Sequence, residues 1–143
     1  MVGRPDGPVR LWSPVMTTTT LVRLPEAFRR IRLELAREHA HPAGSAAFGY
    51  QFVAPLLPDG RLDVDHWRSG RDHCRVVRHR PGEAHVVGRL VHRPGGSWAF
   101  RYGGLSDEAG HRFQDERFVA GEYVSVRDGD EQHTFKVVSV DPV

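Results

Sequence analysis

The chain has 143 residues, of which 39% are hydrophobic and 27% are charged, and its formal net charge is +2. This length is typical of one folded domain with its own core, and the single cysteine, Cys74, excludes an internal disulfide framework and favours a reducing compartment. No apolar run approaches the ~20 residues that cross a bilayer, and no secretory leader pattern opens the chain, so we expect a cytoplasmic protein that does not contact a membrane.

The positive charges are unevenly distributed along the chain. They are nineteen arginines and one lysine, and residues 1–80 carry a net charge of +5 whereas residues 81–143 carry −3. Such asymmetry is typical of a domain with one basic face, and it is also compatible with self-association into a homodimer.

The N-terminal region predicts an arm followed by a helix. Residues 1–20 mix Pro, Gly, Thr and isolated apolar residues without a period, and they predict a disordered or loosely docked arm before a single globular domain at 21–143. A helix is predicted to begin at Pro25 and to end near residues 39–41, because one apolar stripe recurs at spacings of 4, 3 and 4 residues. The stripe consists of Leu24, Phe28, Ile31 and Leu35.

Strand patterns dominate the rest of the chain. Residues 84–103 predict a central β-hairpin that turns at residues 94–97, where Gly95 and Gly96 can adopt the positive φ of a tight reversal. A second hairpin joins residues 122–127 to residues 133–140 through a turn built from Asp and Gly. The other strand candidates are residues 48–57, 74–79 and, at an edge, 112–119, which follows a loop at 103–111.

Residues 62–71 read as a short helix capped by Asp63, with a loop as the alternative. Together these elements predict an α+β, mainly β fold. An N-terminal amphipathic helix would pack on a six- or seven-stranded antiparallel sheet or a small half-open barrel.

Three stretches of the sequence carry a resemblance. They are the run from about residue 31 to residue 57, the turn LVHRPGGSWAF, and the C-terminal stretch GEYVSVRDGDEQHTFKVVSV. Over roughly residues 24–140 the chain resembles a set of uncharacterised bacterial proteins of similar length. The resemblance implies a stand-alone bacterial domain and names no activity, substrate or cofactor.

A basic stretch at residues 68–80, with only Asp72 as a nearby acid, suggests a ligand surface. Beside an aromatic row on the central hairpin it could offer phosphate contacts and stacking for single-stranded nucleic acid, although the alternation of that row favours a role as the core under the helix. The turn at 94–97 could also hold an anion on its backbone N–H groups, or serve only as a turn. The candidate ligand-binding residues are Arg75, Arg78, Arg89, Arg93 and Trp98.

The leading hypothesis is therefore a non-enzymatic binding or interaction module for nucleic acid or another anionic ligand, without a cofactor. The alternative is a small metal-binding β-barrel enzyme, suggested by nine histidines. In it His92 and His133 would converge across the sheet with Glu122 or His111 as the third ligand, although no strand holds a clustered His-x-His. For Cys74, a buried small hydrophobe is favoured over a nucleophile, because the adjacent His73 faces the other way on a strand.

Overall fold

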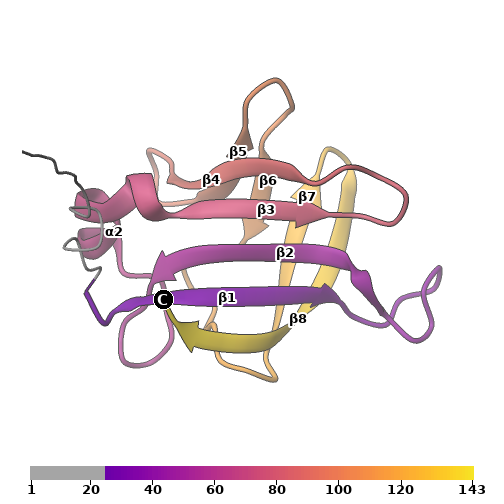
Figure 1. The fold of residues 1–143 in the computed structure, drawn as a ribbon, viewed down its shortest axis with the longest axis horizontal. Coiled ribbons are helices and arrows are strands. Elements are labelled where there is room, and N and C mark those ends of the chain that lie inside the picture. The colour runs from indigo at the N-terminus through magenta and orange to yellow at the C-terminus, as the bar shows by residue number, and fades with distance from the viewer. Residues whose placement is uncertain (1–24) are drawn as a thin grey trace, which may run out of the picture.

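The computed structural model describes residues 25–143, so the predicted arm at 1–20 lies outside the described residues. Within them, eight antiparallel strands follow one another around a closed barrel, and β8 pairs with β1 (Figure 1). The strands are β1 (Phe28–Leu35), β2 (Ser45–Pro55), β3 (Arg75–His79), β4 (Val86–His92), β5 (Trp98–Tyr102), β6 (Glu108–His111), β7 (Tyr123–Asp128) and β8 (Glu131–Pro142). The helix α2 (Val64–Gly70) and the 3-10 turn η1 (Arg71–His73) connect β2 to β3 at one end of the barrel.

The predicted helix from Pro25 is wrong, because residues 28–35 form strand β1. The same residues also alternate with a period of two: Ile31, Leu33 and Leu35 are buried, and charged side chains lie between them. Leu33 decides between the two periods, because it is fully buried although it lies off the helical stripe. By pairing with both β2 and β8, β1 supplies the strand that closes the predicted half-open sheet into a barrel.

Other predicted elements are confirmed. The helix at 62–71 corresponds to α2, and the Asp63 side chain caps it by accepting a hydrogen bond from the backbone N–H of His66. Both hairpins form, and Gly95 and Gly96 have φ values of 94° and 95° in the turn between β4 and β5.

The expected edge strand at 112–119 is wrong. The strand in this region is β6, inside the stretch expected to be a loop. Phe113 and Phe118 instead reach into the barrel from the connection between β6 and β7, and both are buried.

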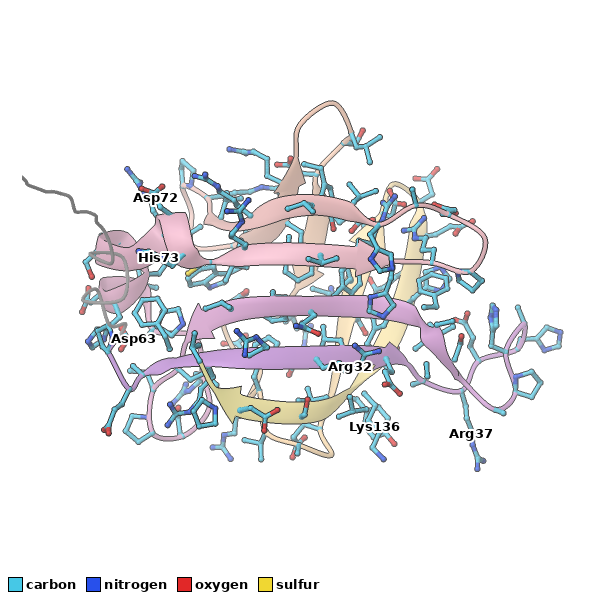
Figure 2. The ribbon with its side chains drawn as sticks, viewed as in Figure 1. Arg32, Arg37, Asp63, Asp72, His73 and Lys136 are labelled. Atoms are coloured by element: carbon cyan, nitrogen blue, oxygen red, sulfur yellow. The ribbon has the colours of Figure 1, made fainter. Side chains whose placement is uncertain are left out.

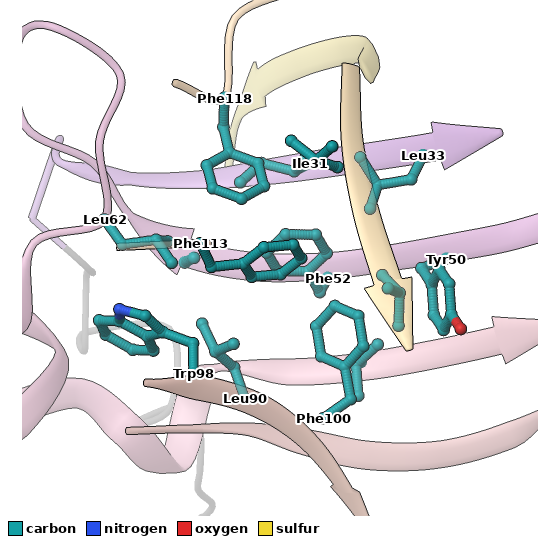
Figure 3. Close-up of a cluster of buried hydrophobic side chains, with 14 of the residues drawn as sticks. Ile31, Leu33, Tyr50, Phe52, Leu62, Leu90, Trp98, Phe100, Phe113 and Phe118 are labelled. Atoms are coloured by element: carbon teal, nitrogen blue, oxygen red, sulfur yellow. The ribbon is translucent and has the colours of Figure 1, made fainter. Parts of the chain in front are cut away.

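Large apolar side chains fill the barrel interior. Figure 3 shows part of this cluster, in which Phe52 and Phe100 lie together with ring centroids 5.2 Å apart. Trp98, Phe100 and Tyr102 alternate along β5 and all point inward, so the aromatic row of the central hairpin is core. This packing matches what an eight-stranded barrel can enclose with side chains alone.

One carboxylate lies inside this core. Glu108 on β6 is 1% exposed at its side chain, and four donors reach it. Its Oε1 accepts hydrogen bonds from the hydroxyls of Tyr50 at 2.9 Å and Tyr102 at 2.7 Å. Its Oε2 accepts from Arg78 Nη1 at 2.9 Å and Arg80 Nη2 at 3.0 Å. Burial and the Glu108 carboxylate raise the pKa of both tyrosines, so they stay protonated and donate.

We predict that Glu108→Gln lowers the free energy of unfolding by about 3–5 kcal/mol, because it leaves the buried guanidinium of Arg78 with only the exposed carboxylate of Glu83, at 3.9 Å, as a counter-charge. Urea denaturation followed by circular dichroism would measure the change. The matched control is Glu131→Gln, which makes the same chemical change at an exposed side chain and should cost less than about 1 kcal/mol. Equal effects of the two substitutions would contradict the role assigned to Glu108.

Candidate ligand site on the outer face of the barrel

Three arginines form a row across the outer face of β3, β4 and β5. Strand register places Arg75 opposite Arg89, and Arg89 opposite Arg101. All three side chains are exposed, because the residues beside them in sequence point into the core. Residues facing one another across antiparallel strands have Cβ atoms about 5 Å apart, so one ligand can reach all three guanidinium groups. We call Arg75, Arg89 and Arg101 the arginine row.

A shallow groove runs beside the arginine row. One part has a volume of about 310 Å³, with Val87, Gly88 and Val91 among its lining residues. An adjoining hollow of about 290 Å³ shares Arg89, Val91 and Arg101 and continues toward α2. Its further lining residues include Trp67, Arg71 and His92. The groove therefore combines apolar walls with several guanidinium groups.

Two carboxylates partly neutralise the row. Asp72, which extends from η1 near the edge of the barrel (Figure 2), lies 3.1 Å from Arg89 Nη1 but is 82% exposed at its side chain. Asp107 lies 3.0 Å from Arg101 Nη2, and the hydrogen bonds of Arg101 hold the pKa of Asp107 below its ordinary value. Within residues 25–143, Arg75 makes no side-chain hydrogen bond or ion pair. Like charges facing one another across strands are destabilising, so the row costs stability.

The structure brings only some of the sequence-predicted ligand residues together. Arg75 and Arg89 lie side by side in the row. Arg78 instead points inward to Glu108, and Trp98 is buried in the core. Arg93 lies near the end of the hairpin and pairs with Asp107 at 3.1 Å. The aromatic row forms the core, as favoured from the sequence, so it offers no stacking surface to a ligand.

Sequence reasoning missed Arg101. It alternates with the inward-facing Phe100 and Tyr102, so it had to face outward. The predicted turn at residues 94–97 also implies pairing that is symmetric about that turn, which places Arg101 opposite Arg89. The signal was therefore present in the hairpin register.

The expected metal ligands do not form a site. The ring of His92 packs on Trp98 with centroids 4.6 Å apart, and Glu122 lies in the connection before β7. His133 instead contacts Glu38, its Nδ1 lying 3.0 Å from Glu38 Oε2. In the part of the chain that the structure describes, no group of three or more His, Cys, Asp or Glu residues could hold a metal ion.

Cys74 is fully buried, and its thiol donates to the Gly70 carbonyl oxygen at 3.7 Å. Burial raises the pKa of this thiol to about 12, so it is not a thiolate at neutral pH. This position agrees with the small buried hydrophobe favoured from the sequence.

Glu38 joins the β1–β2 connection to β8. Its carboxylate contacts His41 Nδ1 at 3.2 Å as well as His133. Burial alone would raise the pKa of Glu38, but the hydrogen bonds of His133 and His41 outweigh it, so the pKa of Glu38 is lowered.

Fold and surface together define a closed antiparallel barrel with an arginine-lined groove on its outer face. No protein-family model, curated protein or solved structure matches the chain. Among residues 25–143, no helix has the length and apolar character needed to cross a membrane.

Arg75→Thr is expected to raise the free energy of unfolding by about 0.2–1 kcal/mol, because it removes a positive charge that faces Arg89 and introduces a good strand former. Arg30→Thr is the matched control on β1, where the facing residue on β8 is Asp141, and it should not stabilise. Urea midpoints of the two variants would be compared with the wild type. Destabilisation by Arg75→Thr would show that the row carries no repulsive cost.

The substitution Glu38→Gln tests the ion pair between Glu38 and His133 through the pH dependence of stability. Because the pKa of folded Glu38 is depressed, its contribution to stability is full above about pH 5 and is lost as pH falls through the folded pKa. The wild type should therefore be more stable than Glu38→Gln near neutrality, and the difference should vanish in acid. Thermal midpoints measured across this range would show the trend.

Glu116→Gln provides the control for that experiment. Burial and the nearby Glu122 raise the pKa of Glu116, so the ionised form is disfavoured in the folded state. Replacing it should stabilise the protein near neutrality, with the gain disappearing in acid. A pH-independent difference for Glu38→Gln would contradict the assigned ion pair.

Proposed function

We propose that this protein is a non-enzymatic binding module that holds a phosphate-bearing ligand, in its polymeric form the backbone of single-stranded nucleic acid, against the arginine row. The observation that carries the proposal is the register of Arg75, Arg89 and Arg101, which sets three like charges side by side on an exposed face. A bound anion would relieve the repulsion within the row.

The chemistry of the row favours phosphate. A guanidinium group donates in a fixed planar fork that matches phosphate oxygens in a bidentate manner. Neighbouring strands lie about 4.8 Å apart, so the row spans about 10 Å from Arg75 to Arg101. That span suits a ligand with several negative groups better than a single small anion. The valines that line the groove can meanwhile pack against an apolar part of the ligand.

Binding by this surface would depend on charge rather than on base identity. Trp98, Phe100 and Tyr102 are buried, so they cannot stack on bases. Without stacking, the affinity comes from phosphate contacts and the release of counterions, and it should fall steeply with salt. We therefore expect little sequence preference, and competition by inorganic polyphosphate, which carries phosphates but no bases.

Fluorescence anisotropy with a labelled single-stranded oligonucleotide tests the proposal. For three phosphate contacts, the logarithm of the binding constant should fall with the logarithm of salt concentration with a slope of about −2. The double variant Arg75→Gln/Arg89→Gln should weaken binding and reduce the steepness of that slope by about 1.4.

The double variant Arg37→Gln/Arg117→Gln is the control, because it removes the same charge from exposed arginines outside the groove. It should retain most of the wild-type affinity and slope. Equal losses in the two double variants would indicate unspecific attraction to a basic protein. Absence of salt-dependent binding by the wild type, together with no effect of polyphosphate, would refute the proposal.

A further inference from the structure

A separate hollow opens at the end of the barrel where β1 begins and β2 and β8 end. Its volume is about 610 Å³, within the range of roughly 300–1,000 Å³ that is usual for small-molecule sites. The walls are mostly apolar. They include Leu56, Leu57, Pro58, Phe118, Val119 and Val140.

The side chains of His66 and Asp63 line this hollow and form a hydrogen bond with each other. Asp63 Oδ2 lies 2.7 Å from His66 Nδ1, and Asp63 Oδ1 accepts the backbone N–H of His66 at 3.2 Å. Burial alone would raise the pKa of Asp63, but the hydrogen bonds of His66 outweigh it and keep the group a carboxylate. A carboxylate can only accept, so in the neutral form of the imidazole Nδ1 carries the proton and Nε2 is an acceptor.

The acceptor Nε2 is available to a ligand. Within residues 25–143 it has no hydrogen-bond partner, and the His66 side chain is 46% exposed. The edge-on packing of His66 against Phe28, with ring centroids 6.5 Å apart, helps to fix the orientation of the imidazole. Histidine general bases have this arrangement: a carboxylate accepts a hydrogen bond from one ring nitrogen and fixes the imidazole, and the other ring nitrogen accepts the proton.

Charge in the hollow favours a neutral ligand. Arg29 contributes one positive charge, and its guanidinium donates to the backbone carbonyl of Glu26. Glu26 and Asp63 line the same hollow and carry negative charges. An anion would therefore find no net positive charge in the hollow. For a neutral apolar molecule, burial of its surface against the apolar walls would make the free energy of binding favourable.

We propose that this hollow binds a small neutral molecule with an apolar ring and one acidic hydroxyl, that is, a phenol acidified by an electron-withdrawing substituent, and that His66 accepts the hydroxyl proton. The O–H bond breaks, its electron pair stays on oxygen, and the proton moves to Nε2. The products are a phenolate and an imidazolium ion that is held by Asp63. Arg29 lines the same hollow and contributes a positive charge there. This site is independent of the arginine row.

The probe is 4-nitrophenol, whose absorbance distinguishes the phenol from the phenolate, added to the full chain at a pH where most of the free probe is protonated. The wild type should give a saturable rise in phenolate absorbance. His66→Gln should weaken binding about tenfold and abolish that rise, because the amide oxygen of Gln can accept a hydrogen bond but cannot take up the proton. His73→Gln, an exposed histidine outside the hollow, should behave as the wild type.

Two further measurements separate the hydroxyl contact from simple burial. Val119→Trp should fill the hollow and abolish binding while His66 is retained. The methyl ether 4-nitroanisole lacks the hydroxyl, so it should bind to the wild type about tenfold more weakly than 4-nitrophenol does. The two probes should differ much less in their affinity for His66→Gln, which cannot take up the proton. Circular dichroism would verify that each variant is folded.

A wild type that shows no saturable change overturns the proposal. So does binding that survives both His66→Gln and Val119→Trp. Retention of 4-nitrophenol binding by Arg75→Gln/Arg89→Gln would support the independence of the two sites. Loss of binding in that variant would place the probe in the arginine groove instead and overturn the assignment to His66.

Discussion

The buried carboxylate of Glu108 determines which side chains the barrel presents to solvent. Tyr50 of β2, Arg78 of β3, Arg80 just after β3 and Tyr102 of β5 all donate to it, and a buried charge left without such partners would be strongly destabilising. Because the side chain of Arg78 must point into the barrel to reach Glu108, only one orientation of β3 is possible. Successive side chains of a strand point to opposite faces, so Arg75 points outward. The strand register then places Arg89 of β4 and Arg101 of β5 on the same outer face as Arg75, so an internal ion pair fixes the geometry of the external arginine row.

The aromatic interior explains why both proposed sites lie on surfaces. Eight-stranded barrels enclose either a packed core or one small ligand, and within residues 25–143 large apolar side chains occupy the interior. What remains for recognition is the outer face of the sheet and the rims of the barrel. The outer face carries charge, whereas the rim beside α2 carries an apolar hollow, so the two locations suit ligands of different chemistry.

Local patterns predicted much of the fold. Both hairpins and the capped helix α2 were evident because turn residues and alternation lie close together in sequence. The closure of the barrel was not evident, because residues 28–35 carry a helical stripe as well as a period-two alternation. Pairing of β1 with β2 and with the distant β8 stabilises the strand. Glu108 was missed because β6 has four residues, too few for alternation to stand out. Of the candidate site, Arg75 and Arg89 were predicted, whereas the inward turn of Arg78 depended on a partner thirty residues away.

Binding of phosphate at the arginine row can be followed residue by residue by titrating the ¹⁵N-labelled protein with inorganic tripolyphosphate and recording the arginine Nε–Hε resonances. We expect the resonances of Arg75, Arg89 and Arg101 to move together and saturate, while those of Arg37 and Arg117 stay in place. Shifts spread evenly over all exposed arginines, or no saturation at the row, would contradict this expectation.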